Sequence, residues 1–124
     1  MELAQARYAD VLVVSVGGRV DHTNAEPFKA GLWPMLAGCR ADGDQLVLEM
    51  TGLEYISSAG LRVLMLAARE VKAQAGTLVI CGLQPVVREI FEISRFNVVF
   101  RVLPDLPRAL AELSARAATA HAAH

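Results

Sequence analysis

The spacing of the apolar residues changes repeatedly along this chain, from the alternation typical of β-strands to the longer period of amphipathic helices. Five segments have the apolar or alternating character of strands, over residues 2–8, 11–16, 45–50, 77–81 and 98–102. Helical periods follow Thr23, the Ser57-Ser58 pair, Pro85 and Pro104, the last extending to about Ala117. The resulting order ββαβαβαβα predicts one α/β domain whose sheet is mostly parallel, with an antiparallel edge strand in an N-terminal hairpin.

The composition favours a folded domain over a disordered chain. Of the 124 residues, 54% are hydrophobic, which is enough for a substantial core. The 12 basic and 13 acidic residues leave a net charge of −1, so no basic surplus indicates nucleic acid binding. No apolar run approaches the roughly 18–20 residues that span a bilayer, and the polar N-terminus is unlike a secretory signal. We expect a cytoplasmic monomer without a membrane segment, with its domain over residues 1–117 and a frayed Ala- and His-rich tail over 118–124.

Neither the cysteines nor the histidines form a pattern typical of metal or redox chemistry. Cys39 and Cys81 lie far apart in the sequence and have no CxxC spacing, so we expect two reduced thiols. His22 lies in the first half of the chain, whereas His121 and His124 belong to the C-terminal segment TAHAAH. The sequence therefore predicts no metal site and no cofactor.

The first helix has an identifiable start and a less certain end. Thr23 and Glu26 have the spacing of a capping box, which predicts that the helix begins at Thr23. Pro27 is compatible with the first turn, where its missing N–H would be unpaired in any case. Pro34 is expected to kink the helix or to end it early, because proline inside a helix removes a backbone hydrogen bond.

The stretch EYISSAGLRVLML, residues 54–66, places Ser57 and Ser58 where a strand changes into a helix. In a parallel α/β sheet such a junction lies at the carboxyl ends of the strands, where ligands and modifications gather. The simplest interpretation is a helix cap, in which a serine oxygen stabilises the first turn by about 1 kcal/mol. A second role is compatible with capping, since the free N–H groups and the dipole of a helix start also favour a phosphate group.

Catalytic interpretations of the two serines have little support. A nucleophile elbow GxSxG would need a glycine where residue 56 is isoleucine, and a base, for which His22 is the only internal histidine. His22 follows the first strong strand, whose end is at the same edge of the sheet as the serines if the two strands are parallel. Its position therefore leaves His22 open as the base of a catalytic triad. The phosphate-binding pattern GxxxxGK[ST] is absent. We therefore expect no hydrolase or ATPase activity, and a protein that is not an enzyme.

Two segments resemble one known family. Residues 46–100, from LVLEMTGLEYISSAGLRVLML to FEISRFNVVF, strongly resemble STAS domains, specifically bacterial anti-sigma factor antagonists. The upstream GGRVDHTNAEPFK resembles the segment G-x-(L/V)-D-x-x-(T/N)-A of that family, with Gly18, Val20, Asp21 and Ala25 at its positions. The resemblance extends from about residue 11 to about residue 113.

The resemblance implies a partner-switching module. In this family the unphosphorylated antagonist binds an anti-sigma factor that is also a serine kinase with a histidine-kinase-like ATPase fold, and so frees a sigma factor. Phosphorylation releases the antagonist, and a PP2C-type phosphatase restores it. The family motif D-S-(S/T)-G-(L/I) aligns Gly60 with its glycine and Ser58 with the acceptor serine. Ser57 replaces the family's aspartate, which leaves Ser57 as the second candidate for the acceptor.

The resemblance also suggests which residues contact the partner, namely Asp21, Thr23, Ser57, Ser58, Gly60 and Arg62. Asp21 and Thr23 are equally compatible with a turn and a cap, and Arg62 with an ordinary solvated face that it shares with Arg69. Two other functions stay open. One is the STAS scaffold subunit of a lipid-transport ABC complex, and the other is a STAS regulatory module without a phosphorylation switch.

Overall fold

A single long strand organises the sheet. The computed structural model describes residues 1–123. The strand β2 (Val11–Val20) pairs antiparallel with β1 (Glu2–Tyr8) and parallel with both β3 (Gln45–Glu49) and β4 (Leu53–Ile56). The sheet continues from β3 through β5 (Leu78–Cys81) to β6 (Val102–Leu103), so its order is β1-β2-β3-β5-β6 with β4 beside β2. The predicted α/β fold, with one antiparallel edge and an otherwise parallel sheet, is confirmed.

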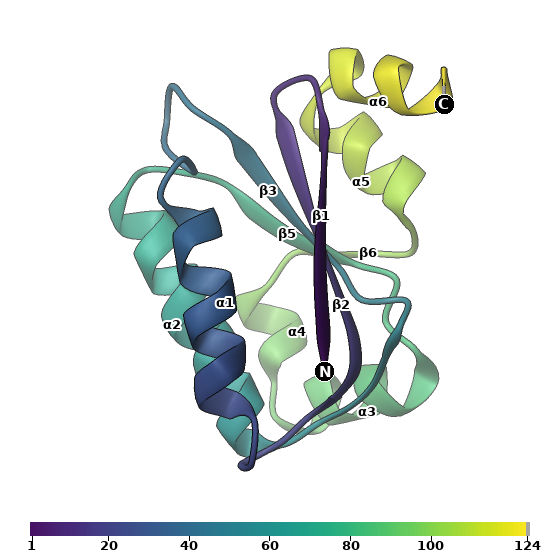
Figure 1. Cartoon of the computed structure of the whole chain (residues 1–124). Helices are drawn as coiled ribbons and strands as arrows, with labels where there is room; N and C mark the ends of the chain where they lie inside the picture. The colour runs from purple at the N-terminus through teal and green to yellow at the C-terminus, as the bar shows by residue number, and fades with distance from the viewer. Residues whose placement is uncertain (124) are drawn as a thin grey trace.

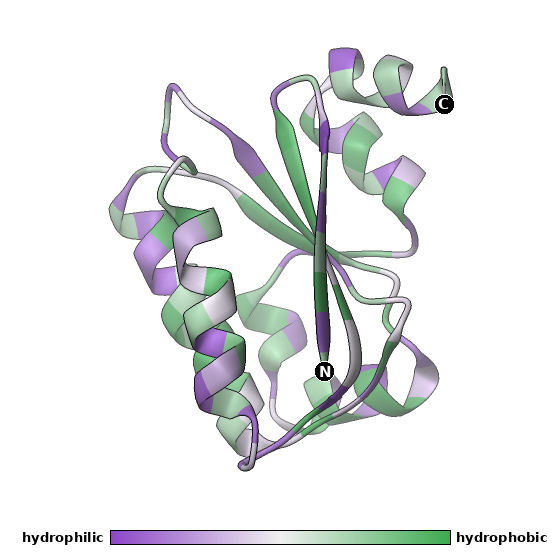
Figure 2. Ribbon diagram, viewed as in Figure 1, coloured by the Kyte–Doolittle hydropathy of each residue, from purple (hydrophilic) through white to green (hydrophobic). Residues whose placement is uncertain are grey.

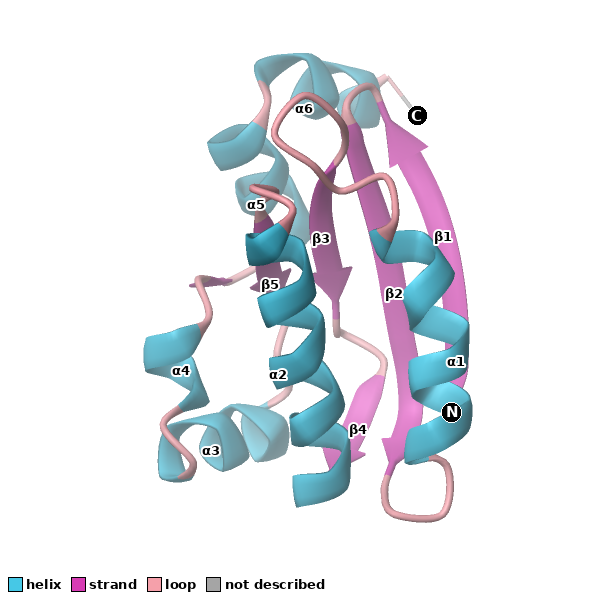
Figure 3. Ribbon diagram, turned by 90° about the vertical axis from the view of Figure 1, so that its left-hand side faces the viewer, coloured by secondary structure: helices cyan, strands magenta, loops and turns pink. Residues whose placement is uncertain are grey.

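Six helices accompany the sheet within the described residues, and they lie on both of its faces (Figure 1). Figure 3 shows α1 and α2 in front of the sheet and α5 and α6 behind it, with α3 and α4 at the side of α2. Their bounds are α1 (Ala25–Leu36), α2 (Ser58–Ala73), α3 (Pro85–Ile93), α4 (Phe96–Val99), α5 (Leu106–Leu113) and α6 (Ala115–Ala122). None of these helices is long and apolar enough to cross a membrane.

The inner strands β2, β3 and β5 are apolar on both sides because both faces of the sheet are covered there, and Figure 2 shows the hydrophobic colour along them. Leu12, Val14 and Val16 join the larger core, beneath α1 and α2. Val11 and Val13, which alternate with them, join a smaller core beneath α5 and α6. Fully burying a valine or leucine side chain contributes about 1.5–3 kcal/mol, so these two cores hold the three layers together.

The segment after β3 departs from the predicted single strand. β3 ends at Glu49, and a turn in which the Leu53 N–H donates to the Met50 carbonyl precedes the separate strand β4. The observed order is therefore ββαββαβααβαα instead of ββαβαβαβα. β2 can pair with both short strands because it is long, with residues 11–15 beside β3 and residues 18–20 beside β4. The pairing with β4 has an irregular register between Gly18 and Arg19. Gly18 has a φ of 79°, a conformation that favours glycine.

The predicted strand over residues 98–102 is wrong for most of its length. Residues 96–99 form the helical turn α4, and only Val102 and Leu103 form β6. A helical turn brings Phe96 and Phe100 to the same side, where their ring centroids lie 6.0 and 6.2 Å from that of Phe91. In an extended strand these two rings would be about 13 Å apart and could not both contact Phe91.

Two further expectations about the helices need correction. Pro34 does not end α1, which continues to Leu36, because the loss of one backbone hydrogen bond still leaves the buried Leu32 and Leu36 packed on the same face. The alternative, a kink at Pro34, stays a prediction. The predicted final helix is broken at Ser114, whose hydroxyl donates to Asp10 and accepts from the Ala117 N–H at 3.2 Å. Residues 118–122 belong to α6, the predicted fraying of this tail stays a prediction, and His124 lies outside the described residues.

The two cysteines are free and lie in different cores, Cys39 in the larger and Cys81 in the smaller. Burial raises the pKa of the Cys39 thiol to about 11 and that of the Cys81 thiol to about 12. Because the thiolate is the reactive form, we expect the native protein to react with a thiol reagent such as DTNB about a hundredfold more slowly than the chain unfolded in guanidinium. Absorbance at saturating reagent measures both rates, and fast reaction of one native thiol would contradict this prediction.

Candidate functional site

The serine junction is formed where β4 ends and α2 begins, and Ser57 is the residue that caps the helix. Its N–H donates to the Val20 carbonyl at 2.9 Å, which joins the end of β4 to the end of β2. Its Oγ accepts from the Gly60 N–H at 3.4 Å, as expected of a helix N-cap. The Ser57 side chain is half-buried, and its Oγ already accepts the Gly60 N–H.

Ser58 is the first residue of α2 and is exposed. Within the described residues its hydroxyl makes no hydrogen bond, unlike that of Ser57. Its position on the first helical turn places it beside backbone N–H groups that have no partner within the helix. The hydroxyl of Ser58 is therefore accessible to another molecule, and the surroundings favour a negative charge there.

Gly60 is buried at the point where α2 passes closest to the sheet. A Cβ atom on this residue would lie 2.6 Å from Cγ1 of Ile56 and 2.8 Å from Cγ1 of Val20, both distances too short for carbon atoms. The glycine allows the helix start to approach the ends of β4 and β2. Gly60 itself is buried and supports the serine junction from beneath, and its predicted contact with a partner stays a prediction.

The loop after β2 lies beside the serine junction because the two strands pair in parallel. Val20 is opposite Ile56 in this pairing, so Asp21 and Ser57 both follow directly at the same edge of the sheet. Asp21 accepts hydrogen bonds from the N–H of Thr23 at 2.9 Å and from its hydroxyl. These two bonds lower the pKa of Asp21, so the carboxylate holds this loop together at neutral pH.

The predicted capping box of Thr23 and Glu26 is wrong. The helix begins at Ala25, and Asn24 occupies the N-cap position without a capping hydrogen bond. The Thr23 hydroxyl bonds to Asp21 instead, which is the local hydrogen bond that competes with helix capping. The Asn24 amide spans the loop, since it donates to the Arg19 carbonyl and accepts from the Asp21 N–H, each at 2.9 Å. Sequence reasoning missed this residue, although it occupies the T/N position of the motif.

A hollow of about 320 Å³, here called the serine hollow, opens beside Ser58. Its lining residues come from α2, from the residue after α3 and from the start of α4, and they are Ser58, Leu61, Arg62, Met65, Leu66, Arg69, Ser94 and Phe96. Ser58 and Arg62 are one helical turn apart and line it together, as their spacing on a helix requires. Ser94 and Phe96 were not predicted as site residues, because the sequence pattern did not predict the helical turn α4.

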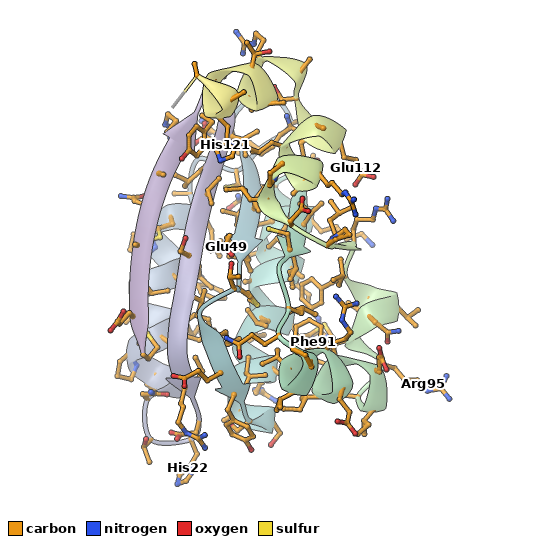
Figure 4. The ribbon with its side chains drawn as sticks, turned by 90° about the vertical axis from the view of Figure 1, so that its right-hand side faces the viewer. His22, Glu49, Phe91, Arg95, Glu112 and His121 are labelled. Carbon is orange, nitrogen blue, oxygen red and sulfur yellow. The ribbon has the colours of Figure 1, made fainter. Side chains whose placement is uncertain are left out.

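The histidines do not complete a catalytic or metal site within residues 1–123. Figure 4 shows His22 and His121 at opposite ends of the molecule. His121 contacts the Tyr8 ring edge-on, with centroids 5.0 Å apart, whereas the exposed His22 makes no hydrogen bond to either serine. Among the described residues no group of three or more potential ligands is placed to hold a metal ion.

The capping role of Ser57 leads to a stability prediction. We expect Ser57→Ala to lower the free energy of unfolding by about 1 kcal/mol, because the Gly60 N–H loses its acceptor. Ser57→Asp should preserve stability, since a carboxylate also caps and is favoured at a helix N-terminus. Urea denaturation measures the three proteins, with Ser58→Ala as the control. Equal stability of Ser57→Ala and wild type would show that the 3.4 Å contact contributes nothing.

Comparison with known proteins identifies the family of this domain. The STAS domain family matches residues 3–109. The proposed anti-sigma factor antagonist BtrV of Bordetella bronchiseptica is 40% identical over 102 residues, which cover 82% of this chain and 85% of that protein.

Solved structures share the fold at lower identity. An anti-sigma factor antagonist from Mycobacterium paratuberculosis has a TM-score of 0.79 at 20% identity, over 90% of this chain and 92% of that one. The phosphorylated form of the Bacillus cell fate determinant SpoIIAA has a TM-score of 0.63 at 16% identity, over 91% of this chain and all of that one (100%). The chain therefore belongs to the anti-sigma factor antagonist family of STAS domain proteins, whose members are regulators and not enzymes.

Proposed function

We propose that this protein is the phosphorylatable antagonist of a partner switch. In its unphosphorylated form it binds an anti-sigma factor that is a serine kinase with a histidine-kinase-like ATPase fold, and phosphorylation of Ser58 releases it. The observation that carries the proposal is the exposed Ser58 hydroxyl, which makes no hydrogen bond within the described residues and stands on the first turn of α2. A PP2C-type phosphatase would reset the switch, and the cycle would operate in the cytoplasm.

The contacts of the two serines favour Ser58 over Ser57 as the acceptor. A kinase must bring the hydroxyl into line with the γ-phosphate of ATP, which requires an accessible oxygen. Ser57 is half-buried and accepts the Gly60 N–H, so its modification would disturb the helix cap. Ser58 can be modified without the loss of any such bond.

The surroundings of Ser58 are suited to a partner that recognises the unmodified serine. Asp21 and Thr23 lie in the adjacent loop, and Arg62 lies one turn along α2 in the serine hollow. These residues form the surface that the kinase would contact, and a phosphate would add its charge to it. That the Bacillus relative SpoIIAA exists in a phosphorylated form supports the view that this fold tolerates the modification.

The alternative functions need no accessible serine. A scaffold subunit of a lipid-transport ABC complex, or a STAS module without switching, would use the fold for binding alone. The exposed Ser58 hydroxyl lies at a helix start beside the loop that Asp21 holds. This placement favours a switch, because a scaffold would need no accessible hydroxyl there.

Phosphorylation assays test the proposal. Purified kinases of the histidine-kinase-like fold from the same genome are incubated with ATP and with wild type, Ser57→Ala or Ser58→Ala, and the sites are mapped by mass spectrometry. We expect phosphate on Ser58 in wild type and in Ser57→Ala, and none in Ser58→Ala. Phosphorylation of Ser58→Ala at Ser57 would transfer the acceptor role to Ser57, and failure of every such kinase would contradict the proposed function.

A further inference from the structure

The serine hollow continues along α2 into a second hollow of about 420 Å³. The second hollow lies between the later turns of α2, the start of β5 and the end of α4, and its lining residues are Met65, Ala68, Arg69, Val71, Lys72, Gly76, Thr77, Leu78, Val99 and Phe100. Met65 and Arg69 line both hollows, so the two form one groove, here called the α2–α4 groove. Figure 3 shows α4 and the end of α3 alongside α2 on this side of the molecule.

One stripe of α2 runs along the groove and carries three cations. Its members follow the four- and three-residue steps of a helix face, and they are Ser58, Arg62, Met65, Arg69 and Lys72. None of the three cations forms an ion pair within the described residues, and no carboxylate lines either hollow. The groove is therefore locally positive in a chain whose net charge is −1.

The groove is apolar between its cations. Met65, Phe96 and Phe100 line it, and Val99 at its edge is half exposed. Ile93 and Val98, at the adjoining ends of α3 and α4, are 77% and 78% exposed. Such apolar exposure beside a groove is typical of a site that another molecule covers.

We propose that the α2–α4 groove is the docking surface for an acidic amphipathic helix of a protein partner. This inference deepens the proposed function. It rests on the proposed function in one respect, because it takes the protein partner that supplies the helix to be the kinase. The long wall is the helix α2, and the opposite wall includes the helical turn α4 and the start of β5, a strand that already pairs with β3 and β6. The groove therefore offers side chains and, among its lining residues, no free strand edge, which suits a helix better than an added strand. The apolar face of the occupant would cover Met65 and Phe96, and its carboxylates would face Arg62, Arg69 and Lys72. From Ser58 to Lys72 the stripe extends about 21 Å, which corresponds to about four turns of a bound helix.

This surface would connect the serine to the partner's charge. Ser58 is the end of the stripe and lies one turn from Arg62, so a phosphate there opposes a carboxylate-bearing helix and neutralises its nearest cation. Phosphorylation would thus weaken docking along the groove as well as at the serine itself.

A matched pair of peptides tests the proposal without any kinase. The probe is a fluorescein-labelled amphipathic peptide of about 16 residues, with leucines on one face and glutamates beside them, and its control has lysines in place of the glutamates. Fluorescence anisotropy measures binding to wild type, to R69E/K72E and to R108E. Arg108 lies on α5, which covers the opposite face of the sheet, so R108E controls for charge reversal itself.

We expect the acidic peptide to bind wild type and R108E alike, and to bind R69E/K72E about tenfold more weakly or worse. The lysine peptide should bind wild type about tenfold more weakly as well. Equal binding of the two peptides, or an unchanged affinity for R69E/K72E, would overturn the proposal. Two other results would overturn it. If R69E/K72E abolished self-association in sedimentation velocity, a second copy of the chain would be the occupant of the groove. If R69E/K72E abolished cosedimentation with vesicles of anionic phospholipid, the occupant would be a membrane.

The two proposals fail separately. Loss of specific peptide binding while Ser58 is still phosphorylated would refute the α2–α4 groove alone. Specific peptide binding without phosphorylation of Ser58 by any of the kinases would refute the switch alone. Circular dichroism and thermal unfolding confirm that R69E/K72E is folded, as expected for two exposed side chains.

Discussion

Phosphorylation of Ser58 is expected to weaken binding to the cognate kinase by about a hundredfold or more. The phosphate would add a charge of about −1.5 to −2 at an exposed position that the partner must approach. The fold should hardly respond, because the free N–H groups and the dipole at the start of α2 favour the added charge, with a stability change of about 1 kcal/mol or less. The affinity therefore changes through the interface and not through unfolding.

Isothermal titration calorimetry with the kinase measures this effect on wild type, phosphorylated wild type, Ser58→Ala and Ser58→Asp. Ser58→Ala should bind as wild type does and stay bound in the presence of ATP, because it cannot be modified. Ser58→Asp should lose part of the affinity, since it brings one charge and fewer acceptor oxygens than phosphate. Equal affinity for all four proteins would leave Ser58 with no part in switching.

Gly60→Val is expected to lower the free energy of unfolding by about 3 kcal/mol. The first added carbon would lie 2.6 Å from Ile56 and 2.8 Å from Val20, and both of these side chains are buried with no free space to enter. Gly60→Ala should be destabilising by a smaller amount, because alanine adds one carbon and gains about 1 kcal/mol of helix propensity over glycine.

Urea denaturation followed by Trp33 fluorescence measures both variants, with Ser58→Ala as the control two residues away. The control should stay within about 0.5 kcal/mol of wild type, since the exposed hydroxyl makes no hydrogen bond in the described structure. Wild-type stability of Gly60→Val would mean that α2 can move away from the sheet at little cost. The close approach of helix and strands would then not be what holds the serine junction in place.

Local pattern was sufficient for much of the fold. The β-branched, apolar segment Val11–Val16 predicted a strand, and the structure has it within β2, between two cores. The change of period after the Ser57-Ser58 pair predicted a helix start at this junction, where α2 begins, because a serine cap and an amphipathic face are both encoded within a few neighbouring positions. The same local signals placed Ser58 at an exposed helix start.

Local pattern was insufficient where short segments could take either conformation. Residues 96–99 have strand-like composition, yet they form α4 because contact with Phe91, in another helix, requires Phe96 and Phe100 on one side of a turn. Thr23 and Glu26 had the spacing of a capping box, but the Thr23 hydroxyl donates to Asp21 and the helix begins two residues later, at Ala25. In the first case the packing of aromatic rings between two helices was worth more than the local propensity, and in the second case another local hydrogen bond competed with the cap.

The sequence by itself determined the α/β class, the serine junction and the residues on the face of α2, because helix and strand periods depend on neighbours a few positions away. Only the tertiary structure decided that β4 pairs with β2, which brings the Asp21 loop beside Ser57. Only the tertiary structure, too, laid α4 against α2 and so formed the α2–α4 groove. Strand order and helix packing depend on contacts between residues far apart in the chain, and no spacing along the sequence encodes those contacts.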